Sequence, residues 1–163
     1  KRTVSPNKEI LGRIRLEGYL ISNRRKKSKE LMYFEKGFML PAKGRVSGVF
    51  GSQRILNGKP RRPHYGIDFH APEGTPVKAM MDGEVTLAEN DMYFTGGTII
   101  FDHGHGISTL YMHMKNINVK VGQKIKQGQI VGTLGQSGRA TGPHLDIRLN
   151  WFDVKLDPAS ILN

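Results

Sequence analysis

Glycine recurs every few positions from Gly44 to the end of the chain, and this spacing constrains the fold more than any other feature. Short runs with β-forming residues lie between the glycines. Many short strands separated by Gly-rich turns are typical of an all-β sandwich or barrel. The sequence therefore predicts a mainly β domain over residues 44–163. Its candidate strands are residues 75–81, 83–88, 98–102, 108–112, 130–134 and 144–150.

The first part of the chain has a helical pattern instead. Ser5 can cap a first turn, and Pro6 suits the first helical position. Apolar residues then recur at near-helical spacing, which predicts a helix from about Pro6 to about Arg25 with an interruption at Gly18. A short strand is expected at residues 31–34.

Positive charge is concentrated in the same segment. The chain of 163 residues has a net charge of +11, and residues 1–30, with ten Lys or Arg and three Glu, carry +7 of it. The basic run at residues 24–29 is interpreted either as a solvated helix end or as a contact with a polyanion such as an anionic cell envelope. It has no interleaved aromatic residues and no accompanying motif, which argues against specific nucleic-acid binding. We treat residues 1–43 as a basic, partly helical segment and expect the β domain to fold after residues 1–40 are deleted.

Several protein classes are excluded by composition. The chain has no cysteine, so it has neither disulfides nor cysteine ligands to zinc, and its compartment stays open. No apolar run approaches the roughly 20 residues of a membrane-spanning helix. No signal peptide is recognisable, and because the sequence starts at Lys1 rather than Met, we expect a targeting segment to have been removed.

Three places in the β domain contain groups that bind metals. His64 and Asp68 form one pair and His144 and Asp146 a second, and Gly and Pro border both; His113 lies between them. Imidazole and carboxylate are the ligands that a divalent transition metal prefers. Because His144 and Asp146 are two apart on a predicted strand, their side chains should share one face. We therefore predict one metal site in one groove.

The surrounding motifs resemble the catalytic domain of the lysostaphin-type (LytM-like) zinc endopeptidases. The resemblance covers roughly residues 44–159, in the order and spacing of that family. The matching motifs are Gly48-Val49-Phe50-Gly51, His64-x-x-x-Asp68, Ala71-Pro72-x-Gly74-Thr75-Pro76-Val77, Asp102-His103-Gly104-x-Gly106, Tyr111-x-His113, Val121-Gly122-x-x-Ile125-x-x-Gly128-Gln129-x-x-Gly132 and Ser137-Gly138-x-x-Thr141-Gly142-Pro143-His144-Leu145.

This resemblance implies a mostly antiparallel β domain of the duplicated hybrid motif type, with a long open groove. It also implies a zinc-dependent endopeptidase that hydrolyses peptide cross-links of bacterial peptidoglycan with one Zn²⁺ per chain. The expected location is the periplasm, the cell envelope or the outside of the cell. Which bond is cut stays open, since some family members cut glycine bridges and others cut cross-links with D-alanine and diaminopimelate. The oligomeric state also stays open.

By position, the resemblance implies metal ligands at His64 and Asp68. It implies catalytic roles for His113 and His144, as proton acceptor and oxyanion stabiliser in an order that the sequence does not assign. Most of the family has a second histidine as the third ligand, two residues after the position of His144. This chain has Asp146 there, which makes the expected ligand set His64, Asp68 and Asp146 and adds a negative charge.

Asp146 also motivates a competing hypothesis, a catalytically silent LytM-like domain that binds the cell wall or activates an amidase. A carrier domain of the biotinyl or lipoyl type ranks below both. His70 is either a substitute ligand or a residue of the groove rim. His103 and His105 are expected at the groove edge or surface, and Asp102 in a turn.

Overall fold

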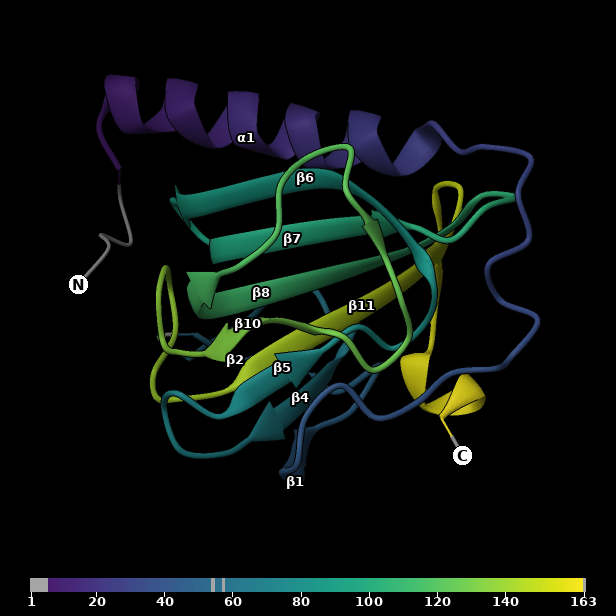
Figure 1. The fold of residues 1–163 in the computed structure, drawn as a ribbon. Helices are drawn as coiled ribbons and strands as arrows, with labels where there is room; N and C mark the ends of the chain where they lie inside the picture. The colour runs from purple at the N-terminus through teal and green to yellow at the C-terminus, as the bar shows by residue number, and fades with distance from the viewer. Residues whose placement is uncertain (1–5, 54, 57, 163) are drawn as a thin grey trace.

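The structure is a computed structural model that describes residues 6–53, 55–56 and 58–162 (Figure 1). Within these residues, ten strands join into one sheet, and a two-stranded hairpin, one α-helix and one 3-10 helix complete the fold. The elements are α1 (Lys8–Lys26), β1 (Arg45–Gly48), β2 (Ile55–Leu56), β3 (Lys59–Pro60), β4 (Ile67–His70), β5 (Pro76–Lys78), β6 (Gly83–Met92), β7 (Gly96–Asp102), β8 (Ile107–Ile117), β9 (Lys124–Ile125), β10 (Ile130–Leu134), β11 (Leu145–Trp151), β12 (Val154–Leu156) and η1 (Pro158–Ile161).

The sheet is antiparallel at every strand pair that the structure describes, which confirms the predicted fold class. Its main path runs β1-β4-β11-β8-β7-β6-β9, while β10 pairs with both β5 and β8, and β12 pairs with β11. The long strand β8 changes partner along its length: Ile107–Met112 pairs with β11, and Met114–Ile117 pairs with β10. The sheet therefore folds over at the change of partner, near His113.

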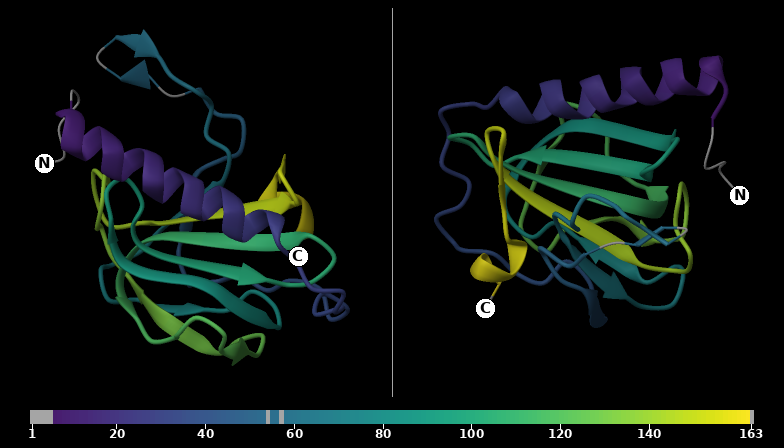
Figure 2. Two further views of the ribbon diagram at one scale, coloured as in Figure 1. Left: turned by 90° about the horizontal axis from the view of Figure 1, so that it is seen from above. Right: turned by 180° about the vertical axis from the view of Figure 1, so that it is seen from behind.

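Apolar side chains fill both faces of this sheet. The larger core contains Phe69, Phe101 and Tyr111, together with other buried residues of β4, β5, β10 and β11. A smaller cluster on the other face of β6, β7 and β8 is covered by Leu20 and Ile21 of α1. The helix lies along β6 in Figure 1 and crosses the sheet in the view from above in Figure 2. As a result β7 is buried over its whole length.

The predicted N-terminal helix is confirmed, with small differences at its start. Asn7 caps α1, because its side chain accepts a hydrogen bond from the backbone N–H of Ile10 (2.9 Å). Ser5, the expected cap, lies outside the described residues. Gly18 does not interrupt the helix, since the packing of the neighbouring turn on the sheet outweighs the low helix propensity of a single glycine.

Two strand predictions were wrong in part. Residues 31–34 form no strand, because Tyr33 makes one backbone hydrogen bond to His103 (3.1 Å) and no ladder continues it. The strand expected at 75–81 is limited to β5. Beyond it, the N–H of Met80 donates instead to the hydroxyl of Tyr111 (2.8 Å). The other candidate strands are confirmed with shifted or extended ends.

The segment before the β domain packs along it. The carboxylate of Asp102 accepts hydrogen bonds from the hydroxyl of Ser28 (2.6 Å) and the N–H of Lys29 (2.9 Å), and Phe38 forms a β-bridge with Leu162. The boundary between residues 43 and 44 stays a proposal. No helix of the described residues combines the length and apolarity needed to cross a membrane.

Candidate metal centre and catalytic groove

The candidate metal centre begins with the register of two neighbouring strands. Asp68 on β4 lies directly opposite Asp146 on β11. Two like charges at opposed positions of an antiparallel pair repel each other. A positive charge between these two carboxylates would therefore stabilise the folded chain. The two residues are 78 positions apart in the sequence, so only the pairing of β4 with β11 brings them together.

His64 completes the cluster from the loop before β4. It is held there by two backbone hydrogen bonds with residues 51 and 52. Its Nε2 lies 3.1 Å from Oδ1 of Asp68 and 3.3 Å from Oδ2 of Asp146. Zinc at about 2.0–2.2 Å from tetrahedral ligands separates the ligand atoms by roughly 3.2–3.6 Å. Neither ring nitrogen of the buried His64 has hydrogen-bond geometry with a group of the described residues. The donor types, the spacing and this buried ring fit a zinc ion.

The charges of the cluster shift the pKa values of its members. Burial lowers the pKa of His64, but the carboxylates of Asp146 and Asp68 outweigh burial and raise it to about 9. Burial raises the pKa of Asp146, but His64 and Arg148 outweigh burial and hold it well below its usual range. Either a proton on His64 or a metal cation can thus offset the negative charge of Asp68 and Asp146.

Two glycines leave the space that the carboxylates occupy. A Cβ at Gly48 would lie 2.4 Å from Oδ2 of Asp68, and a Cβ at Gly66 would lie 2.6 Å from Oδ1 of Asp146. Real Cβ atoms essentially never approach a heavy atom this closely. Glycine at position 48 therefore leaves room for the cluster, and glycine at position 66 leaves room both for the cluster and for the backbone carbonyl of Ile147, which lies 2.5 Å from the same Cβ position.

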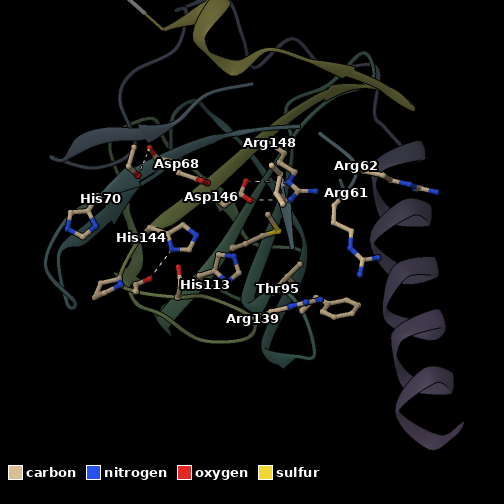
Figure 3. A pocket seen from close by; sticks show the side chains of 17 residues that line it. Arg61, Arg62, Asp68, His70, Thr95, His113, Arg139, His144, Asp146 and Arg148 are labelled. Carbon is tan, nitrogen blue, oxygen red and sulfur yellow. Dashed lines mark hydrogen bonds and ion pairs between the residues drawn. The ribbon is translucent and has the colours of Figure 1, made fainter. Parts of the chain in front are cut away.

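His113 and His144 lie side by side next to the cluster (Figure 3). Their ring centroids are 4.6 Å apart. Nδ1 of His113 lies 2.8 Å from the carbonyl of Ser137, and Nδ1 of His144 lies 2.9 Å from the carbonyl of Gly142. A carbonyl only accepts, so Nδ1 carries the proton in both rings and Nε2 is the acceptor of each neutral ring. Burial lowers the pKa of His113, which keeps its ring neutral at neutral pH.

The backbone of His113 departs from regular strand geometry. It has a φ of 65°, which non-glycine residues rarely adopt. In a regular strand, residues three apart point to opposite faces of the sheet. Tyr111 and Met114 both contribute to the larger core, so the alternation of side chains is shifted by one residue between them, as in a β-bulge. This irregularity lets both Met112 and His113 line the same groove.

The groove has a volume of about 780 Å³ and contains both histidines and both carboxylates. Phe94 and Thr95, in the turn between β6 and β7, form part of its wall. Four arginines also line it: Arg61, Arg62, Arg139 and Arg148. The β2–β3 hairpin, which stands away from the sheet in Figure 2, leads into the first two of them.

The structure thus brings together all five residues predicted for the site: His64, Asp68, His113, His144 and Asp146. His70 lines the groove, but it is exposed and not part of the cluster that the described residues form. His105 is exposed, as expected. Asp102 ends β7 and accepts a hydrogen bond from the N–H of Gly104 (2.9 Å), as a turn residue does.

The prediction for His103 was wrong. Its side chain is buried, with Nδ1 2.7 Å from the carbonyl of Asp82 and Nε2 2.7 Å from the hydroxyl of Thr109. A Gly-rich context suggested a surface loop, but the segment at residues 28–39 covers this turn. The sequence interpretation also missed Arg148, although its spacing of two residues from Asp146 on a predicted strand already placed both on one face.

A β groove with a His/Asp cluster beside two further histidines has the features of a metal-dependent hydrolase. The chain belongs to Peptidase family M23, which matches residues 62–158. It is 40% identical over 113 residues to peptidoglycan DD-endopeptidase ShyA of Vibrio cholerae, covering 69% of this chain and 26% of ShyA. This chain therefore spans about a quarter of that relative.

Solved structures agree with this assignment. A peptidase M23 structure from Pseudomonas aeruginosa superposes with a TM-score of 0.81 at 32% identity, covering 95% of this chain and 63% of that one. The catalytic domain of lysostaphin from Staphylococcus simulans superposes with a TM-score of 0.63 at 33% identity, covering 72% and 90%. The resemblance found in the sequence is confirmed.

Proposed function

We propose that this chain is a zinc-dependent endopeptidase domain that hydrolyses peptide cross-links of bacterial peptidoglycan. The observation that carries the proposal is the convergence of His64, Asp68 and Asp146 beside two histidines with open Nε2 atoms in one groove. The family and the name of the relative in Vibrio cholerae support it. His64, Asp68 and Asp146 hold one Zn²⁺ in this proposal.

A zinc ion held by His64, Asp68 and Asp146 would supply polarisation of the scissile carbonyl and a water nucleophile at neutral pH. The two histidines supply the proton chemistry. Since both rings have the same tautomer, either Nε2 can accept a proton from water and pass it to the departing amine. The other ring, when protonated, donates a hydrogen bond to the oxyanion.

The charge of the groove supports one of the two substrate types. Arg61, Arg62 and Arg139 are exposed at its edge, while its acidic lining residues, Asp68 and Asp146, belong to the metal cluster. Figure 3 places these arginines on the side of Asp146 opposite to His70. Guanidinium groups pair with carboxylates. We therefore favour cross-links with D-alanine and diaminopimelate, which contain free carboxylates, over neutral glycine bridges.

A location at the cell envelope follows from this substrate. Residues 24–29 are the proposed contact with an anionic envelope, but Arg25 does not take part. It is buried, and its Nε donates to the hydroxyl of Ser108 (3.0 Å). Arg24, Lys26 and Lys27 are exposed and available for such a contact.

Zinc content and hydrolysis test the proposal together. The purified chain should contain one zinc, release soluble fragments from peptidoglycan, lose this activity to a chelator and regain it with added zinc. His113→Ala and His144→Ala should keep zinc and lose turnover by at least about a hundredfold, while His105→Ala serves as the surface control. A chain that binds peptidoglycan, but does not bind zinc and does not cut peptidoglycan, would instead be the silent binding domain.

A further inference from the structure

Asp146 has a second charged partner besides the metal cluster. Arg148 follows it by two residues on β11, so both side chains share one face of the sheet. The guanidinium contacts both carboxylate oxygens, with Nη2 3.1 Å from Oδ2 and Nε 3.3 Å from Oδ1. Figure 3 shows Arg148 on the side of Asp146 away from Asp68. The carboxylate thus lies between the cluster and a permanent positive charge.

The charges of this arrangement balance. A ligand set of two histidines and one aspartate, as the resemblance implies for this family, carries one negative charge. Here Asp68 and Asp146 together carry two, and the guanidinium of Arg148 returns the sum over these three side chains to one negative charge. The side chain of Asp146 is 2% exposed and that of Arg148 31%, so water screens their interaction less than at an open surface.

The backbone around the pair is shaped to hold it. A Cβ at Gly66 would lie 2.9 Å from Cγ of Arg148 as well as 2.6 Å from the Asp146 carboxylate. The carbonyl of Arg148 accepts a hydrogen bond from Nη2 of the buried Arg25 (3.4 Å). Arg25 of α1 thus contacts the backbone of Arg148, and the glycine before β4 leaves room for the start of its side chain.

We propose that Asp146 and Arg148 form one unit that replaces a neutral histidine at the third ligand position. Arg148 is then a positioning residue of the metal centre. It holds the carboxylate by two hydrogen bonds and offsets its charge, so that the loaded centre keeps the net charge of a two-histidine, one-aspartate site. The inference rests on the proposed zinc function and concerns residues of this chain only.

A double-mutant cycle on zinc affinity tests the unit. The dissociation constant of zinc is measured by chelator competition at one pH and ionic strength for the parent, Asp146→His, Arg148→Gln and the combined variant. Asp146→His alone should weaken zinc binding by at least about tenfold, because the charge of Arg148 then faces the dication without a carboxylate between them. The combined variant should return to within about threefold of the parent, because removing the positive charge at residue 148 compensates for the carboxylate lost at residue 146.

Substitutions at Arg148 alone separate charge from packing. Arg148→Gln should tighten zinc binding by about tenfold, because one positive charge near the dication is removed. Arg148→Lys keeps the charge and should stay within about threefold of the parent. Thermal melting of the metal-free proteins will show whether Asp146→His folds. If it does not, the comparison of Arg148→Gln with Arg148→Lys still tests whether the charge of residue 148 affects zinc binding.

Three results are informative in different ways. A combined variant that binds zinc as weakly as Asp146→His, or weaker zinc binding in Arg148→Gln, would overturn the charge-offsetting unit while leaving the proposed enzyme intact. A parent chain without measurable zinc binding would overturn the proposed function itself, and this inference with it. Tight zinc binding by Asp146→His with Arg148 unchanged would show that the arginine is irrelevant to the centre.

Discussion

At the scale of single residues, His103 shows how a histidine in a Gly-rich segment can be purely structural. Its ring is buried between Phe38 and Phe101, and both nitrogens contact protein oxygens. Burial lowers its pKa from the ordinary value of 6.5 to about 4. The neutral ring is thus part of the folded core, and its protonation opposes folding.

The stability of the chain should therefore fall in mild acid through this one residue. Between pH 6.5 and 4 the unfolded state binds a proton at His103 and the folded state does not, so stability decreases as pH falls through this window. The whole effect is about 3 kcal/mol. Denaturant unfolding of the parent and of His103→Gln at several pH values measures it. The variant should lose this component of the pH dependence, and His105→Gln, an exposed neighbour, should keep it. Equal slopes in all three proteins would contradict the prediction.

At the scale of elements, α1 acts as a cover for the second face of the sheet. Leu20 and Ile21 pack on the cluster of Leu87, Ile100 and Leu110. Glu17 also accepts a hydrogen bond from the backbone N–H of Tyr93 (2.6 Å), next to the groove residue Phe94. The helix therefore supports both the core and one wall of the groove.

Substitutions of a packed and of an exposed leucine of α1 measure this cover. Leu20→Ser should destabilise the chain by about 1–3 kcal/mol, because a packed side chain is replaced by a small polar one. Leu16→Ser should change stability by less than about 0.5 kcal/mol, since Leu16 is 61% exposed. Both variants lose similar helix propensity, so the difference in unfolding free energy reports packing. If the two variants were equally stable, the helix would not contribute to the core.

At the scale of the whole molecule, we expect the uneven distribution of charge along the groove to affect which substrate is cut. The groove has arginines at one end and the metal cluster at its centre. Arg139 contacts the groove wall at Phe94: its guanidinium lies 5.6 Å from the ring centroid of Phe94, and its backbone N–H donates to the carbonyl of that residue (2.9 Å). It is suited to hold a substrate carboxylate at a defined position.

Arg139→Gln should lower kcat/KM about three- to tenfold on a cross-linked peptide with a free diaminopimelate carboxylate. On the same peptide with that carboxylate amidated, the substitution should have little effect. Arg24→Gln, on the exposed side of α1, is the matched control for net charge. An unchanged preference between the two peptides would mean that the groove arginines do not recognise the carboxylate.

Local patterns were sufficient for much of the fold and site. The glycine-separated runs predicted most strands, because a strand of alternating or apolar residues between turns depends on neighbours in sequence. The pairs His64/Asp68 and His144/Asp146 predicted a metal cluster because the ligand chemistry is a property of residue type. Prediction failed at residues 31–34 and at His103, where burial and hydrogen bonds come from segments distant in the sequence.

The sequence by itself determined the family, the mainly β class and the chemical types of the five site residues. Only the tertiary structure decided how those residues act on one another. It placed Asp68 opposite Asp146, turned His113 into the groove through a positive φ, and put Arg148 against the Asp146 carboxylate. The physical reason is that residue types and local spacing are written in the chain, whereas strand register, bulges and partly buried ion pairs arise only when distant strands pair and exclude water.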